Sequence, residues 1–198
     1  MKNGYLTPVK YEQVSIEIKK SRFIACSRPV INRDEAMEFL KELKAQYPDA
    51  RHHCWAYLIG NPLAASTAAM NDDGEPSGTA GKSILNVIQH KKIGDIMVIV
   101  VRYFGGIKLG AGGLTRAYSS ATENLLSKIE LAECVPMCVT SLEFDFSLEN
   151  QIRHWLYSNE GEIVSIEYGR EVKVDVSLPT DGLQALVAFC QSKGIIVD

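Results

Sequence analysis

The sequence has no apolar stretch long enough to cross a membrane. Its longest strongly apolar run, Ile96 to Val101, is bounded by Asp95 and Arg102, whereas a membrane helix needs about 20 predominantly apolar residues. The first five residues also lack the apolar segment of a signal peptide. We therefore expect a cytoplasmic protein that is not attached to a membrane.

Metal-binding spacings are also missing. No Cys-x2-Cys or His-x3-His pair accompanies the few cysteines and histidines, so we predict no metal site and no cofactor. An odd, scattered set of cysteines without a secretory segment indicates reduced thiols. These are Cys26, Cys54, Cys134, Cys138 and Cys190. Cys54 shares a face of its expected strand with His52, which leaves a nucleophilic Cys–His pair or simple packing as the two interpretations.

There is no internal repeat, low-complexity tract or Pro/Ser-rich linker, and 198 residues suffice for two small domains. Positive and negative residues are distributed unevenly along the chain. Residues 1–134 carry 17 Lys+Arg and 14 Asp+Glu, a net charge of +3, and residues 135–198 carry 4 and 10, a net charge of −6. We predict two domains, 1–134 and 135–198, joined near Ala132 to Pro136.

Periodicity predicts mixed α and β structure in the first domain. Alternating Val14, Ile16 and Ile18 indicate a strand that pairs with residues 22–26 in a hairpin. Asn32 or Asp34 is expected to cap a helix that ends near Gln46. Residues 60–81 show no periodic pattern and are expected to form a long loop. The remaining expected elements are strands at 52–59 and 96–101, helices at 83–91 and 114–129, and a glycine-rich turn at 105–113.

The second domain shows a clearer alternation of apolar and polar residues. We expect strands at 138–146, 162–168, 171–178 and 195–197, with helices at 149–158 and from Thr180 or Asp181 to Gly194. This order, β-α-β-β-α-β, is that of the ferredoxin-like split unit. The whole chain is therefore predicted to belong to the α+β class.

The strongest local motif runs from Val101 to Tyr118. Glycines let backbone amides approach a ligand closely, and the N-terminus of a following helix attracts anions. The candidate residues are Gly105, Gly106, Gly110, Arg102, Lys108 and Arg116. This chemistry suits a phosphate of a nucleotide or of RNA, and the alternative is a tight structural turn.

Two nucleotide motifs are incomplete. The third glycine of a dinucleotide fingerprint is replaced by Thr115, and the first glycine of a P-loop ending in Gly81-Lys82-Ser83 is replaced by Pro76. We therefore expect neither classical nucleotide site.

An acidic, turn-rich loop forms a second candidate site. Its residues are Asp72, Asp73, Glu75 and Lys82. Clustered carboxylates suit a divalent cation or an enzyme site, and a solvated acidic turn is the alternative. An enzyme with hydrolase or phosphate-ester chemistry would combine this loop with the glycine-rich basic turn.

Further cations precede these motifs in the chain. Lys20 and Arg22 flank the expected hairpin corner, and Arg51 precedes the next strand. Together with the cations of the glycine-rich motif they would form one basic face for nucleic acid. Phe23, Tyr103 and Phe104 would supply stacking surfaces for bases.

Four segments give the chain a resemblance to the YigZ/IMPACT family. They are Lys20-Ser21-Arg22-Phe23-Ile24-Ala25, His53-Cys54-Trp55-Ala56-Tyr57, the stretch from Asp72 to Gly81, and the stretch from Val101 to Gly110. The resemblance covers residues 15–130, and the remainder is similar to the smaller C-terminal domain of bacterial members.

The resemblance implies a fold for each domain. The first would be a ribosomal-protein-like α/β domain similar to domain IV of elongation factor G, and the second a ferredoxin-like domain. Eukaryotic members are linked to translational control through a protein partner, whereas bacterial members resemble RNA- or ribosome-associated proteins.

We expect a non-catalytic RNA- or ribosome-binding protein that regulates translation. The phosphate-ester enzyme described above is the alternative, and a protein-interaction module built on the acidic second domain is a third interpretation. The RNA or protein target and the oligomeric state do not follow from the sequence.

Overall fold

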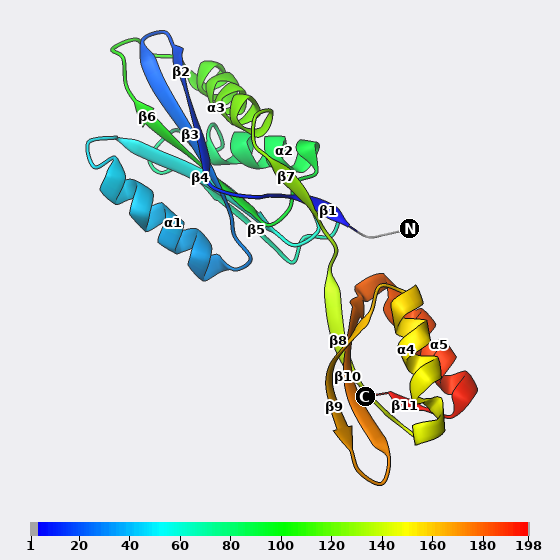
Figure 1. Ribbon diagram of the computed structural model, residues 1–198. Helices are drawn as coiled ribbons and strands as arrows, with labels where there is room; N and C mark the ends of the chain where they lie inside the picture. The colour runs from blue at the N-terminus through cyan, green and yellow to red at the C-terminus, as the bar shows by residue number, and fades with distance from the viewer. Residues whose placement is uncertain (1–3, 198) are drawn as a thin grey trace. The chain divides into compact units, whose positions relative to one another are not determined.

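The computed structural model describes residues 4–197 and divides the chain into two compact units. We call Tyr5–Cys134 the N-terminal unit and Val135–Asp198 the C-terminal unit. Each mixes helices with antiparallel sheets (Figure 1), so the predicted α+β class is confirmed.

A five-stranded antiparallel sheet forms the centre of the N-terminal unit (Figure 1). One helix covers one face of this sheet and two helices cover the other. In sheet order, the strands are β2 (Glu12–Ile18), β3 (Ser21–Pro29), β6 (Ile96–Tyr103), β4 (His52–Ile59) and β5 (Thr67–Asn71). The helices are α1 (Arg33–Gln46) on one face, and α2 (Gly81–Lys91) and α3 (Ala111–Leu126) on the other.

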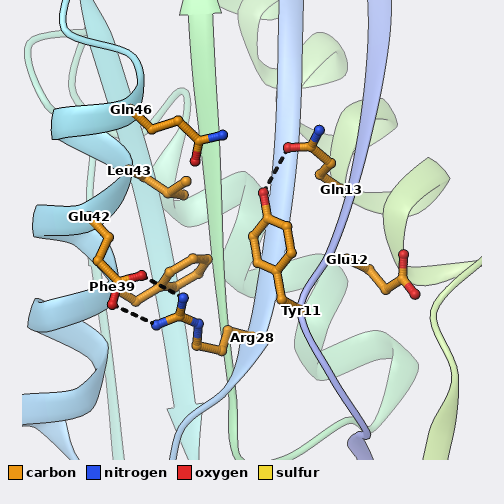
Figure 2. Close-up of a pocket in the computed structure, with 8 residues that line it drawn as sticks. All are labelled: Tyr11, Glu12, Gln13, Arg28, Phe39, Glu42, Leu43 and Gln46. Carbon is orange, nitrogen blue, oxygen red and sulfur yellow. Dashed lines mark hydrogen bonds and ion pairs between the residues drawn. The ribbon is translucent and has the colours of Figure 1, made fainter.

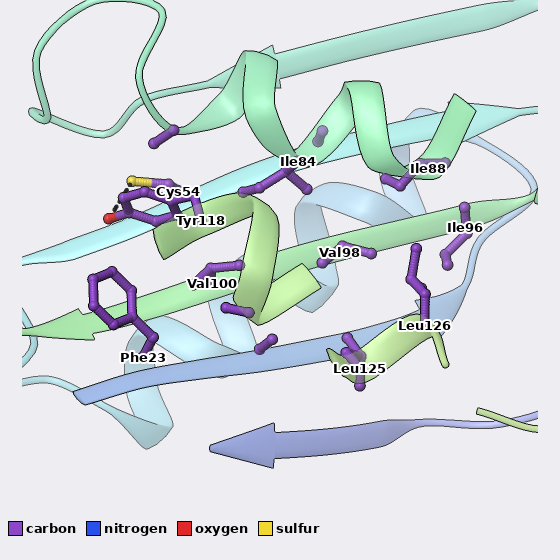
Figure 3. Packing of buried hydrophobic residues seen from close by; sticks show 14 of the residues in the cluster. Phe23, Cys54, Ile84, Ile88, Ile96, Val98, Val100, Tyr118, Leu125 and Leu126 are labelled. Atoms are coloured by element: carbon purple, nitrogen blue, oxygen red, sulfur yellow. Dashed lines mark hydrogen bonds between the residues drawn. The ribbon is translucent and has the colours of Figure 1, made fainter. Parts of the chain in front are cut away.

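The central strand β6 is buried on both faces, as its continuous β-branched run predicts. Ile96, Val98 and Val100 pack under α2 and α3 (Figure 3), whereas Met97 and Ile99 pack under α1. The even-numbered positions of β6 therefore all face α2 and α3, and the next even position is Arg102.

The predicted β2–β3 hairpin is confirmed, and its register runs from Glu12 opposite Ser27 to Ile18 opposite Ser21. Lys19 and Lys20 form its turn, with φ angles of 47° and 63°. Asn32 caps α1 by accepting a hydrogen bond from the Glu35 amide.

Several predicted boundaries were wrong. The region expected to be one loop, 60–81, contains β5, a short and largely exposed edge strand whose sequence does not alternate. Two more strands, β1 (Tyr5–Pro8) and β7 (Leu131–Cys134), were not predicted and pair with each other. Helix α3 begins at Ala111, three residues before its expected start.

The C-terminal unit has one four-stranded antiparallel sheet in the order β11-β8-β10-β9. Its strands are β8 (Met137–Phe144), β9 (Glu162–Tyr168), β10 (Val172–Pro179) and β11 (Ile196–Val197). Helices α4 (Glu149–Ser158) and α5 (Leu183–Lys193) pack on one face (Figure 1). The predicted β-α-β-β-α-β order is confirmed, apart from short 3-10 turns before each helix.

Candidate functional site

A pocket of about 360 Å³ lies where α3 begins, at one end of the five-stranded sheet. We call it the α3 pocket. Three separate stretches of the chain line it: the start of β4, the loop before α2, and the segment from the end of β6 into α3. The lining residues are Arg51, His52, Glu75, Pro76, Arg102, Phe104, Lys108, Leu109, Gly110, Ala111 and Leu114.

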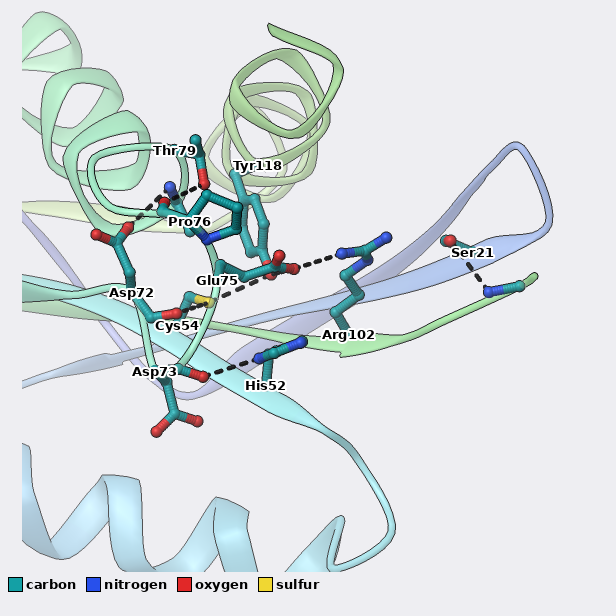
Figure 4. A network of polar contacts seen from close by, with 12 residues as sticks. Ser21, His52, Cys54, Asp72, Asp73, Glu75, Pro76, Thr79, Arg102 and Tyr118 are labelled. Carbon is teal, nitrogen blue, oxygen red and sulfur yellow. Dashed lines mark hydrogen bonds and ion pairs between the residues drawn. The ribbon is translucent and has the colours of Figure 1, made fainter. Parts of the chain in front are cut away.

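A buried ion pair forms part of the pocket wall (Figure 4). Arg102 Nη1 lies 2.5 Å from Glu75 Oε1, and the two side chains are only 7% and 4% exposed. Tyr118 donates a hydrogen bond of 2.9 Å to the same carboxylate oxygen. Arg102 Nε is buried without a hydrogen-bond partner among the described residues.

Strand register explains why Arg102 is buried. It pairs with Phe23 of β3 and with His52 of β4, so the three side chains lie in one row on the α3 side of the sheet. The guanidinium carbon of Arg102 lies 5.5 Å from the Phe23 ring centroid and 5.6 Å from that of Phe104. Phe23 is fully buried, so its predicted role as a stacking surface for bases was wrong.

Behind the ion pair, Cys54 is a packing residue. Its Sγ lies 3.2 Å from Tyr118 Oη and 2.9 Å from the Asp72 carbonyl oxygen. Burial raises the pKa of the Cys54 thiol to about 12, and the same effect raises the pKa of Tyr118. Because a nucleophilic cysteine needs a lowered pKa, the structure favours packing over a nucleophilic Cys–His pair.

The acidic loop directs its carboxylates to different partners. Asp72 accepts hydrogen bonds from the backbone amides of Gly78, Ala80 and Gly81, at 2.7, 2.9 and 2.8 Å. Asp73 accepts from the His53 amide and lies 3.2 Å from Lys44 Nζ. Across residues 4–197, no group of three or more His, Cys, Asp or Glu residues is placed to hold a metal ion.

We predict that Asp72→Ala lowers the free energy of unfolding by about 1–3 kcal/mol at neutral pH, because three amides lose their acceptor. Although burial by itself raises the pKa of Asp72, the three amides hold it below its usual value. The carboxylate therefore stabilises the fold above its unfolded pKa of about 3.9, and this stabilisation is lost as pH falls through the lower folded pKa. Urea unfolding at pH 7 and at pH 3 measures the effect.

The difference between wild type and Asp72→Ala should shrink at pH 3. Asp49→Ala, which removes an exposed carboxylate, is the control and should change stability by less than about 0.5 kcal/mol. If the free energies of unfolding of wild type and Asp72→Ala differed by the same amount at both pH values, the prediction would be contradicted.

The N-terminus of α3 opens on the pocket through Gly110 and Ala111. Gly110 has a φ of 70° and supplies no capping side chain, and the first turn of the helix contains no acidic residue. The first amides of a helix carry a partial positive charge and are free to bind an anion. This end of α3 therefore favours a negatively charged ligand.

The structure brings together three of the six cations that were predicted to form one basic face. Arg51 and Lys108 are exposed and line the α3 pocket with buried Arg102. Arg116 is exposed one turn further along α3, and Lys20 and Arg22 lie in the β2–β3 hairpin. None of these last three is a lining residue of the pocket. Arg22 lies over the Tyr103 ring, 4.5 Å from its centroid, so Tyr103 is partly covered.

The glycines of the motif have different roles. The Gly105 amide donates a 3.1 Å hydrogen bond to Ser21 Oγ and holds the loop against the hairpin (Figure 4). Gly106 and Gly110 have positive φ angles of 86° and 70°. For this site, sequence reasoning did not single out five of the lining residues, His52, Pro76, Leu109, Ala111 and Leu114. The last three lie within the motif but carry no charge, and His52 and Pro76 belong to segments distant in the sequence.

A second pocket, of about 350 Å³, lies on the α1 side of the sheet (Figure 2). Among residues 4–197, Arg28 is its only lining cation, and it makes a bidentate pair with Glu42 at 3.1 and 2.5 Å. Glu12 also lines this pocket, so its net charge is negative. It is therefore less suited to an anion than the α3 pocket.

Comparison with known proteins identifies related sequences for both units. The Impact N-terminal domain matches residues 19–126, and a domain of unknown function, DUF1949, matches residues 142–189. The IMPACT family member YigZ of Escherichia coli K12 is 36% identical over 176 residues, which cover 89% of this chain and 86% of the relative. The IMPACT family member YvyE of Bacillus subtilis 168 is 38% identical over 175 residues, covering 88% of this chain and 80% of the relative.

A solved structure supports the fold. A crystal structure described as that of a hypothetical protein matches with a TM-score of 0.72 and 32% sequence identity. The match covers 100% of this chain and 97% of that chain. Separately, no helix within residues 4–197 is long and apolar enough to span a membrane.

Proposed function

Because this chain belongs to the IMPACT family, we propose that it is a translation-related regulator that binds RNA, including ribosomal RNA, without catalysing a reaction. The observation that carries this proposal is the α3 pocket, where Arg51, Arg102 and Lys108 meet the open N-terminus of a 16-residue helix. The proposed place of action is the cytoplasm.

The division of charge supports a role for the N-terminal unit in binding RNA. Residues 1–134 have a net charge of +3, whereas residues 135–198 have a net charge of −6. Phosphate contacts from Lys, Arg and helix N-termini supply most of the sequence-independent affinity for nucleic acid. Arg116 of α3 and the hairpin residues Lys20 and Arg22 are proposed to extend the contact beyond the pocket.

We also propose a fold assignment for each unit. The N-terminal unit, with the IMPACT/YigZ domain at residues 1–134, would be similar to domain IV of elongation factor G. Residues 135–198 would form a ferredoxin-like domain, since the β-α-β-β-α-β order and the sheet order β11-β8-β10-β9 fit that fold. A negatively charged surface repels RNA, so we assign a protein partner to the C-terminal unit.

The test compares wild type with an Arg51→Ala/Lys108→Ala/Arg116→Ala variant in binding to single-stranded RNA and to purified ribosomes across a salt series. All three side chains are exposed, so the variant should remain folded. Each lost phosphate contact lowers the slope of log affinity against log salt by about 0.7 for a single strand. We expect weaker binding and a slope reduced by about 2.

A matched control removes the same charge elsewhere on the N-terminal unit. The variant Arg33→Ala/Lys41→Ala/Lys128→Ala changes three exposed cations outside the α3 pocket. It should bind RNA nearly as wild type does. Equal losses in both variants would show that only net charge matters, and no RNA binding by wild type at low salt would refute the proposed function.

A further inference from the structure

We infer that the α3 pocket holds a single nucleotide, with its phosphate at the start of α3 and its base against the ring of Phe104. This inference rests on the proposed function and deepens it, because it names the unit of RNA that is recognised. The nucleotide comes from an unpaired RNA strand or from a free mononucleotide, and the two sources are separated by the test below.

The size and composition of the pocket suit a nucleotide better than a bare anion. A volume of about 360 Å³ falls within the range of about 300–1,000 Å³ typical of small-molecule sites. Beside the cations, the lining includes five apolar residues: Pro76, Phe104, Leu109, Ala111 and Leu114. Apolar lining residues contribute little to the binding of inorganic phosphate, whereas they can pack against the large apolar face of a base.

The ring of Phe104 is placed to stack against the apolar face of a base. It is 50% exposed although it lines the pocket, and the guanidinium of Arg102 lies 5.6 Å from its ring centroid. A cation over one side of an aromatic ring restrains the ring and leaves the rest of its surface available. Unstacked bases bind to such exposed aromatic rings in single-stranded RNA recognition.

Arg102 provides the independent sign that a ligand belongs here. Its side chain is 7% exposed, yet among the described residues it donates a hydrogen bond only through Nη1, to Glu75. Its Nε has no partner within residues 4–197. Buried guanidinium nitrogens normally all have hydrogen-bond partners. In the protein alone, Arg102 therefore makes fewer hydrogen bonds than a buried arginine usually does. Arg102 lines the pocket, so a nucleotide bound there lies beside a buried cation whose hydrogen-bonding capacity the protein alone does not fill.

The charges favour a phosphate group over a carboxylate-rich or cationic ligand. Three lining cations, Arg51, Arg102 and Lys108, face one lining carboxylate, Glu75. Glu75 already accepts hydrogen bonds from Arg102 and Tyr118, which leaves Arg51, Lys108 and the first amides of α3 for the phosphate. The phosphate and the base then contact opposite ends of the segment 104–111.

The test uses isothermal titration of the full chain with four probes: AMP, inorganic phosphate, a 5′-phosphorylated single-stranded RNA hexamer, and the same sequence as a duplex. The variants are Phe104→Ala, Phe104→Trp and Ile107→Ala. Ile107 is the matched control, because it lies in the same loop and is 42% exposed but does not line the pocket. Circular dichroism checks that each variant is folded.

We expect the hexamer to bind more tightly than AMP, and AMP more tightly than inorganic phosphate. Loss of one stacked base corresponds to about a 5- to 150-fold loss of affinity, so Phe104→Ala should weaken hexamer binding by that factor. Phe104→Trp should retain binding, and Ile107→Ala should leave it unchanged. AMP binding as tight as hexamer binding would identify the free nucleotide as the ligand.

Three results would overturn the inference. Duplex binding equal to that of the hexamer would show that no base enters the pocket. Equal affinity for inorganic phosphate and AMP would reduce the site to an anion site. Full binding by Phe104→Ala, together with loss of binding in the Arg51→Ala/Lys108→Ala/Arg116→Ala variant, would remove the nucleotide pocket and leave RNA binding intact. If the wild-type protein binds no RNA, the proposed function fails with it.

Discussion

Replacement of Arg102 by alanine is expected to lower the free energy of unfolding by about 3–5 kcal/mol, because it leaves a buried carboxylate without its cation. The carboxylate of Glu75 is only 4% exposed, and Arg102 lies 2.5 Å from it. Without Arg102, the carboxylate of Glu75 would keep the hydrogen bond from Tyr118 but would lose the positive charge beside it. Urea denaturation followed by circular dichroism measures the loss.

A double variant separates the charge effect from the loss of packing. In Arg102→Met/Glu75→Gln both charges are removed while Tyr118 keeps an acceptor, so we expect it to recover much of the stability lost in Arg102→Ala. Arg116→Ala removes an exposed arginine and should change stability by less than about 0.5 kcal/mol. If Arg102→Ala behaved like Arg116→Ala, the ion pair would have no structural role.

This expectation also decides how binding should be tested. Arg102 is one of the three cations that sequence reasoning assigns to the glycine-rich motif, yet its removal would damage the fold. A loss of RNA binding in Arg102→Ala would therefore not distinguish contact from unfolding. Exposed Arg51 and Lys108 avoid this problem.

Gly105→Ala is the second change with a large expected effect. A Cβ atom at Gly105 would lie 2.0 Å from both the carbonyl carbon and the carbonyl oxygen of Lys20, and 2.5 Å from the Ser21 nitrogen. These are backbone atoms of the β2–β3 hairpin and cannot move aside as a flexible side chain can. We expect a loss of about 3 kcal/mol in the free energy of unfolding, and weaker RNA binding because the displaced loop lines the α3 pocket.

Gly112→Ala is the matched control, for which we expect no loss of stability. Its Cβ would meet only Arg116 Nη1, at an ordinary 3.7 Å, and Gly112 lies in the first turn of α3. Alanine is a better helix former than glycine by about 0.8–1 kcal/mol in a helix interior, so stability should rise slightly or stay unchanged. Thermal unfolding of the two variants compares them. Equal melting temperatures would show that the close approach of Gly105 to the backbone of the β2–β3 hairpin does not affect stability.

Local patterns predicted the elements that bury a clear stripe of apolar residues. The boundaries of α4 and β9 agree with the predicted ones, and the β2–β3 hairpin follows from alternation at Val14, Ile16 and Ile18. The missed strands β1, β5 and β7 are four or five residues long, and all but one of their residues lie at least partly exposed. Their pairing depends on partners distant in sequence, which short patterns do not report.

The candidate site was predicted in its residue types but not in its geometry. The glycine-rich motif and its cations follow from composition and spacing. The burial of Arg102 does not, although one signal was present: it continues the even-numbered positions of Ile96, Val98 and Val100 on β6. The partnership of Arg102 with Glu75 joins segments 27 positions apart, and only the strand register and the loop before α2 bring them together.

The most direct test of the account is an NMR titration of the ¹⁵N-labelled full chain with the single-stranded RNA hexamer at low salt. We predict that the amide signals of residues 104–114, and those of Arg51 and His52, shift during the titration and return when salt is raised. Signals of α1, which covers the opposite face of the sheet, should not shift. Shifts centred on α1 or on the C-terminal unit, with those of residues 104–114 unchanged, would contradict RNA binding at the α3 pocket.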